Sequence, residues 1–114
     1  MLTIYHNPRC KKSREGFELV KESGQDFEVR EYLKEPVTEE ELSELLEQLG
    51  MAPIELVRTD EKIWKENYKG KDLSDDELVR VMVQHPKLIQ RPIVVKENKA
   101  VVGRPATKIS DLLG

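Results

Sequence analysis

The residues best suited to chemistry lie around Cys10, in the segment YHNPRCKKSRE at positions 5–15. Cys10 is the single cysteine of the chain. Four cations lie within four residues of it: Arg9, Lys11, Lys12 and Arg14. Positive charges and the free backbone N–H groups at the start of a helix stabilise a thiolate. The segment therefore predicts a nucleophilic cysteine, and the alternative is a buried, inert thiol.

Two polar neighbours of Cys10 have roles that the sequence leaves open. Ser13 either hydrogen-bonds the thiolate from one helical turn along or only stabilises the start of the helix. His6 either supports the thiolate electrostatically when protonated or is a solvated histidine at a strand edge. A single cysteine excludes an internal disulfide, and with two histidines it is too few for a structural zinc site. Redox chemistry at Cys10 therefore needs a second thiol from another molecule.

Three arginines far from Cys10 in the sequence are candidates for binding an anion: Arg58, Arg91 and Arg104. Arg91 and Arg104 each precede a proline, which favours an extended backbone at the arginine. Guanidinium groups bind tetrahedral oxyanions through paired hydrogen bonds that lysine does not reproduce. Around a thiolate, such groups would hold a multiply charged anion against the nucleophile. Because the chain has 19 Lys and Arg, an ordinary surface charge is the alternative for each.

The first third of the chain predicts a parallel strand pair joined by a helix. Alternating residues predict a strand over 2–6, Asn7-Pro8 signals a turn, and apolar spacing predicts a helix over 11–22. DFEVREYL at 26–33 predicts a second strand. A strand, helix and strand in this order form a right-handed unit with parallel strands.

The middle of the chain is predicted to be helical. Thr38 with Glu41 indicates a capping box, and the helix it opens ends at Gly50. Short helices are expected within 53–58 and 60–68. Ser74 with Glu77 indicates a second capping box, at the start of a helix that ends before Pro86.

The last part of the chain predicts a hairpin and a final helix. Strands at 92–95 and 100–103 flank a turn at 97–99, and Pro105 suits the first turn of the helix. The whole order predicts one α/β domain over 1–114. It is thioredoxin-like, with a four-stranded mixed sheet and a helical insertion at about 38–89 between the βαβ and ββα parts. In such a core Pro92, which opens the third strand, faces the cysteine at the helix start.

Composition limits the classes of function. Hydrophobic residues make up 38% of the chain and charged residues 36%, with a net charge of −3. This balance argues against general nucleic-acid binding. No apolar run approaches the roughly 20 residues of a membrane span, and the amino terminus lacks a signal-peptide pattern. We therefore expect a cytoplasmic protein with no membrane contact.

Four motifs along the chain resemble the glutaredoxin-dependent arsenate reductase (ArsC) family, in its short branch: IYHNPRCKKSR, LVRTDEKIWKE, QHPKLIQRPIVV and VGRP. The resemblance implies a thiolate at Cys10 that attacks arsenate and forms a covalent adduct. Glutathione, as co-substrate, then attacks this adduct, and glutaredoxin completes the reduction to arsenite. It also implies oxyanion binding by the three arginines named above, tuning of the cysteine by His6, and no bound metal or flavin.

Two other readings stay open beside the reductase. Spx-type regulators, which share this fold and bind RNA polymerase, resemble the segment HPKLIQRPI, but they carry C-x-x-C where Ser13 stands here. The third reading is a glutathione-linked thiol adaptor without oxyanion chemistry. Lys11 and Lys12 also stand where the well-known reductases carry small residues after the cysteine.

Overall fold

The computed structural model describes residues 1–114, whose contacts divide the chain into two units. Unit 1 consists of Met1–Glu35 and Arg91–Gly114, and unit 2 consists of Pro36–Gln90. The insertion expected at about 38–89 therefore falls inside unit 2. That the two units form a single domain stays a prediction.

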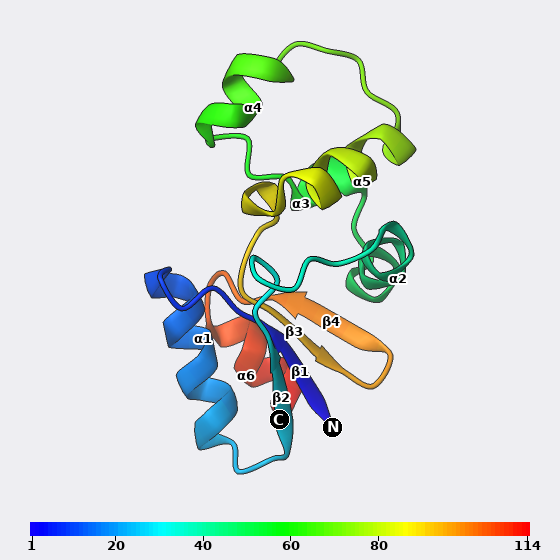
Figure 1. Ribbon diagram of the computed structural model, residues 1–114. Coiled ribbons are helices and arrows are strands. Elements are labelled where there is room, and N and C mark those ends of the chain that lie inside the picture. Colours follow the sequence, from blue (N-terminus) through cyan, green and yellow to red (C-terminus); the bar gives the residue numbers. More distant parts are fainter. The chain divides into compact units, whose positions relative to one another are not determined.

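Unit 1 contains a four-stranded mixed sheet and two helices (Figure 1). Its elements are β1 (Leu2–Tyr5), α1 (Lys11–Glu22), β2 (Phe27–Arg30), β3 (Ile93–Lys96), β4 (Lys99–Val102) and α6 (Thr107–Leu113). The strand order is β2-β1-β3-β4, with β1 parallel to β2 and the other neighbours antiparallel. The predicted mixed sheet and the parallel first pair are confirmed.

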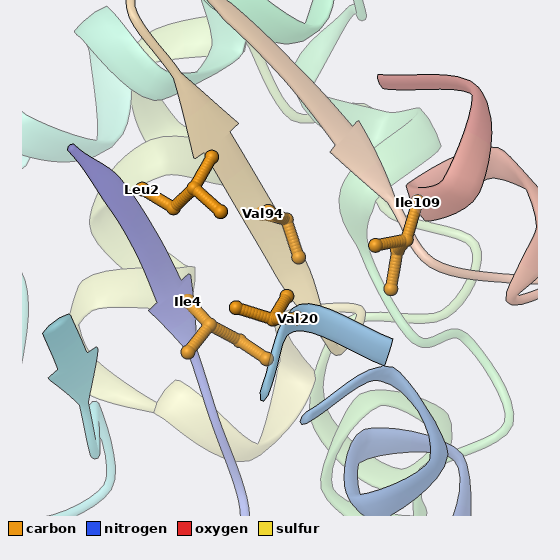
Figure 2. Packing of buried hydrophobic residues seen from close by; sticks show 5 residues of the cluster. All are labelled: Leu2, Ile4, Val20, Val94 and Ile109. Atoms are coloured by element: carbon orange, nitrogen blue, oxygen red, sulfur yellow. The ribbon is translucent and has the colours of Figure 1, made fainter. Parts of the chain in front are cut away.

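The core of unit 1 lies between one face of the sheet and the two helices. Register brings Leu2 opposite Phe27 and Ile4 opposite Val94, so their side chains share a face. Figure 2 shows the buried cluster on that face: Leu2, Ile4, Val20 of α1, Val94 and Ile109 of α6. Burial of each of these side chains stabilises the fold by roughly 1.5–3 kcal/mol. This packing fixes α1 on the sheet.

The second strand is shorter than the sequence predicted. β2 ends at Arg30, whereas the alternating pattern ran on to residue 33. Arg30 pairs with Tyr5, the last residue of β1, and its carbonyl accepts the His6 N–H at 2.9 Å. The chain then turns, with the Glu31 carbonyl accepting two later N–H groups. The prediction failed because the length of a strand depends on its partner.

Two other boundaries near the end of the chain also differ from the prediction. The turn of the hairpin is Glu97–Asn98, since Lys99 already pairs with Lys96. Glu97 adopts a positive φ of 56°. The last helix begins at Thr107, two residues after Pro105, because the Pro105 carbonyl first closes a short turn with the Lys108 N–H at 3.1 Å.

Unit 2 is helical, as predicted. It contains α2 (Glu39–Leu49), α3 (Pro53–Leu56), α4 (Lys62–Asn67), α5 (Asp75–Gln84) and a 3₁₀ turn, η1 (Pro86–Leu88). Both predicted capping boxes are present, Thr38 with Glu41 and Ser74 with Glu77, and Gly50 ends α2 in the left-handed conformation. Within the unit α5 packs against α2 and α3. No helix has the length and apolar character needed to cross a membrane.

Candidate active site at the start of α1

Cys10 is the N-cap residue of α1. Its backbone is extended, with φ −96° and ψ 125°, and its side chain is partly buried. No side chain caps the first turn, and that turn contains no acidic residue. The first N–H groups of a helix have no partner within it, and they carry partial positive charge. The start of α1 therefore offers a favourable environment to an anion beside Cys10.

Asn7 organises the loop that leads to Cys10. Its carbonyl accepts the Cys10 N–H at 3.0 Å, and its side-chain Oδ1 accepts the Arg9 N–H at 3.1 Å. Arg14 adds a bond from its Nη1 to the Pro8 carbonyl at 3.0 Å. The sequence indicated a turn here but not that Asn7 holds it through both main chain and side chain. This bonding fixes the path of the backbone up to the cysteine.

Ser13 connects the loop to His6. Its side chain is 0% exposed, and its Oγ accepts the Asn7 N–H at 2.9 Å and lies 2.8 Å from His6 Nδ1. The two contacts of the hydroxyl are thus with the loop and the histidine, and neither is with the Cys10 sulfur. Of the two roles considered for Ser13, the geometry favours support of the helix start.

His6 is buried at the end of β1. Burial lowers its pKa below the ordinary 6.5, and the positive charge of Arg14 acts in the same direction, while Glu31 opposes both. The ring stacks on Phe17 of α1, with centroids 5.0 Å apart. A lowered pKa leaves His6 uncharged at neutral pH. In that state its contact with Ser13 positions the loop.

Pro92 lies against α1 at a glycine. A Cβ built on Gly16 would lie 2.7 Å from Pro92 Cγ and 2.8 Å from Ile109 Cδ1. Gly103 has no more room: a Cβ there would lie 2.5 Å from Ile109 Cδ1, and its N–H donates to the Pro92 carbonyl at 2.8 Å. The role of Gly16 was not predicted from the sequence, although a glycine inside a helix was a signal. These contacts bring the start of β3 against α1.

Arg91 and Arg104 flank this contact in the sequence. Arg91 precedes Pro92 through a cis peptide bond, and Arg104 follows Gly103 and precedes Pro105 through another. Arg91 Nε is buried and has no hydrogen-bond acceptor. Nearly all buried donors in proteins have a partner, so one without an acceptor calls for an explanation. An anion at this position would supply the missing acceptor.

Arg58 belongs to unit 2 and already has a partner there. Its Nη1 donates to Glu61 Oε1 at 2.6 Å, and its side chain is 14% exposed. The Arg58 N–H also donates to the Leu88 carbonyl at 2.7 Å. The pairing with Glu61 was not predicted from the sequence, although its i,i+3 spacing from Arg58 was a signal. Binding of an oxyanion by Arg58 stays a prediction.

Comparison with known proteins finds close relatives over nearly the whole chain. Residues 5–112 match the model of the ArsC family. The uncharacterized protein YfgD of Escherichia coli K12 is 46% identical over 113 residues, which cover 97% of this chain and 95% of YfgD. An arsenate reductase of Neisseria meningitidis is 39% identical over 114 residues, which cover 98% of this chain and 97% of that protein.

The solved structures agree with the sequence relatives. The structure of an arsenate reductase from Vibrio cholerae superposes with a TM-score of 0.91 at 42% identity, covering 96% of this chain and 95% of that one. This likeness confirms the predicted thioredoxin-like α/β fold.

Proposed function

Since the chain belongs to the ArsC family, we propose that it reduces arsenate to arsenite with Cys10 as the nucleophile. The observation that carries the proposal is the open start of α1, where Cys10 meets unpaired N–H groups and no carboxylate. The buried Arg91 Nε without an acceptor supports it independently, because a tetrahedral oxyanion supplies acceptors of the right geometry.

The proposed reaction begins at the Cys10 sulfur. The thiolate attacks arsenic and displaces one oxygen as water, which leaves a covalent sulfur–arsenic bond. A glutathione thiolate then attacks arsenic in this adduct and displaces a second oxygen as water, so that arsenic is bonded to both the Cys10 and the glutathione sulfur. Because the chain has one cysteine, an external thiol protein of the glutaredoxin class completes the reduction. Its thiolate attacks the glutathione sulfur, the electron pair of the broken sulfur–arsenic bond reduces arsenic, and the two external sulfurs form a disulfide. Water then releases arsenite from Cys10.

In this proposal the remaining site residues bind the anion or position the loop. Arg91 and Arg104 neutralise arsenate as the negatively charged thiolate approaches, a role in which one donor is worth on the order of 10²-fold in rate. The role of Arg58 as a third guanidinium stays a prediction, since Arg58 and its partner Glu61 belong to the other unit. His6 and Ser13 hold the loop, and Pro92 holds Arg91 next to α1.

The test is arsenite formation in the presence of glutathione and glutaredoxin. Wild type should turn over, and Cys10→Ser should not. Arg91→Ala and Arg104→Ala should each lower kcat/KM for arsenate on the order of 10²-fold. Arg91→Lys should recover only part, because an ammonium keeps the charge but loses the paired geometry. Arg80→Ala is the control, since its exposed side chain makes only a 3.6 Å contact with Glu39 in unit 2.

The same assay rejects the proposal on a clear result. Absence of arsenite from the wild-type reaction, or unchanged kinetics in both arginine variants, contradicts it. Either result would favour the regulator or the thiol adaptor considered from the sequence.

A further inference from the structure

Arg58 and Glu61 form an ion pair within unit 2, and the proposed reaction gives its acidic member no role. Arg58 Nη1 donates to Glu61 Oε1 at 2.6 Å, and the two side chains are 14% and 30% exposed. Ion pairs in full contact with water contribute little, whereas partly buried charges are screened less and interact more strongly. The pair is therefore a stable feature of unit 2.

Hydrogen bonds hold the backbone on which both side chains stand. The Arg58 N–H donates to the Leu88 carbonyl at 2.7 Å, next to an isolated bridge between Val57 and Ile89. The Glu61 N–H donates to the Arg58 carbonyl at 3.2 Å and closes a turn between the two residues. Because both side chains leave a fixed backbone, the guanidinium and the carboxylate meet without further ordering of the chain.

Helix capping does not explain the acidic residue at position 61. Glu61 is the N-cap residue of α4, but its side chain makes no capping hydrogen bond. Short side chains cap well at this position, as Thr38 and Ser74 do for α2 and α5. The Glu61 carboxylate is bonded to Arg58 instead. Its function is therefore to be sought in that contact.

Both members of the pair keep hydrogen-bonding capacity that the protein does not use. Every nitrogen of a guanidinium carries a donor, yet only Nη1 of Arg58 has an acceptor, so Nε and Nη2 are free. On the carboxylate, Glu61 Oε2 accepts no hydrogen bond. An anion bound to the free nitrogens of Arg58 lies within a few ångströms of this carboxylate, because the guanidinium is small and planar. Free donors and a free acceptor thus meet at one place.

The carboxylate makes this place sensitive to whether an anion carries a proton. An ionised carboxylate only accepts hydrogen bonds, so a ligand beside it has to donate one. Arsenate and phosphate keep at least one O–H group at neutral pH, whereas sulfate has none. A hydrogen oxyanion therefore gives Glu61 a charge-assisted hydrogen bond. Sulfate instead brings negative acceptors against a negative acceptor, which is unfavourable.

We propose that Glu61 is a specificity-determining residue, which makes Arg58 prefer oxyanions that carry a proton over fully ionised ones such as sulfate. This inference rests on the proposed function in one respect, namely that Arg58 contacts the oxyanion. The preference is a difference in affinity, so sulfate still binds, but more weakly. It acts against an anion that resembles hydrogen arsenate in shape and charge and differs from it in lacking the proton.

A purely structural role for Glu61 leads to a different expectation. The pair would then only stabilise the turn between residues 58 and 61, and its loss would lower the free energy of unfolding without changing the choice of anion. Glu61→Gln separates the two roles. The amide keeps the size of the side chain and an oxygen that accepts from Arg58 Nη1, but it adds N–H donors that bond to sulfate.

The experiment measures the binding of inorganic phosphate and of sulfate, neither of which reacts with Cys10, to the reduced protein. The Cζ carbon resonance of Arg58 is followed as each anion is added at constant ionic strength. Mildly alkaline buffer gives both anions two negative charges and leaves one O–H on phosphate. The control is Glu66→Gln, which removes the same charge from α4 at an exposed position, paired with Lys62 only at 3.7 Å. The ratio of the two dissociation constants is compared among wild type, Glu61→Gln and this control.

In wild type we expect phosphate to bind at Arg58 on the order of 10-fold more tightly than sulfate, the effect of one charge-assisted hydrogen bond. Glu61→Gln should bring the two affinities close together, chiefly through tighter binding of sulfate. Glu66→Gln should keep the wild-type ratio. Chemical unfolding of the same proteins reports any structural contribution of the pair separately.

Three results would overturn the inference. They are an equal ratio in wild type and Glu61→Gln, an equal loss of the preference in Glu66→Gln, and no saturable change at Arg58 with either anion. The outcome is separate from arsenate turnover. A protein that shows the preference but forms no arsenite would lose the proposed function and keep the role of Glu61. A protein that reduces arsenate with an unchanged ratio in Glu61→Gln would lose only the inference.

Discussion

The free N–H groups in the first turn of α1 are treated differently from those of α2 and α5. Thr38 and Ser74 cap their helices by accepting the N–H groups of Glu41 and Glu77 at 3.1 and 3.2 Å. Each of those helices adds three acidic residues in the first turn. α1 begins at Cys10 with no cap, no acid and two lysines. Of these three helix starts, two are satisfied internally and that of α1 is left open, as are the starts of the shorter helices α4 and α6; α1 is the open start that carries the cysteine.

The uncapped start lowers the stability of α1, and packing at other positions of the helix compensates for this loss. A missing N-cap costs about 1 kcal/mol, and cations at the wrong end of the dipole cost a few tenths more. α1 is held instead by Val20 in the core and by the contact of Gly16 with Pro92. Each of these explanations is open to a direct test.

The largest effect is expected from replacing Cys10, which also gives α1 an N-cap. Cys10→Ser places a good N-cap oxygen at the position that lacks one. We expect arsenate turnover to fall by at least about 10⁴-fold, because the nucleophile is lost. The free energy of unfolding should rise by about 1 kcal/mol. Turnover and urea unfolding of the same preparations measure both. A less stable Cys10→Ser variant would show that α1 is not under-capped.

The next largest effect is expected at Gly16, where α1 packs against Pro92 and Ile109. Gly16→Ala would gain up to about 1 kcal/mol in the helix itself, but its new Cβ would clash with Pro92 and Ile109. We expect a net loss of about 1–3 kcal/mol in the free energy of unfolding, as for other overpacked cores. Glu18→Ala, at an exposed position of the same helix, is the control. Equal stability of the two variants would contradict the close approach.

A smaller effect is expected from removing the N-cap of α5. Ser74→Ala removes the acceptor of the Glu77 N–H and should cost about 1 kcal/mol of stability. Ser74→Asp should restore most of it, since aspartate is also a good N-cap. Neither change should alter the thiol chemistry of Cys10. Chemical unfolding and the rate of Cys10 alkylation check these expectations, and a loss of alkylation rate in Ser74→Ala would argue against them.

The smallest effect is expected from the titration of His6. Because burial lowers its folded-state pKa below 6.5, the unfolded chain binds a proton more readily than the folded chain. The free energy of unfolding should therefore fall as pH drops from about 6.5 through the lowered folded-state pKa. Above about pH 6.5 His6 is uncharged in both states, and its contribution to the pH dependence should vanish. His6→Gln should remove the contribution. Unfolding of both proteins from pH 8 to about pH 5 measures it. If the free energy of unfolding changed with pH equally in wild type and His6→Gln, the lowered pKa of buried His6 would be contradicted.

The sequence predicted well those features that neighbouring residues determine. Both capping boxes, the left-handed Gly50 and the position of Cys10 before α1 follow from a few adjacent side chains. β2 ended early because its extent depends on where β1 ends. The contact of Gly16 with Pro92 and the pairing of Arg58 with Glu61 are tertiary features, and a local pattern carries only a weak signal for them. The functional roles of the site residues stay predictions.

The most direct test compares the helix starts within one sample. The backbone amide resonances and the arginine Nε–H resonances of the reduced protein are followed as sulfate, a tetrahedral anion that does not react, is added. We predict saturable shifts at the amides of Lys11, Lys12 and Ser13 and at Arg91 Nε–H. The amides in the first turns of α2 and α5 should shift little. Shifts at those two helices that equal or exceed those of α1, or no saturable change at α1, would contradict the claim that its start is built to receive an anion.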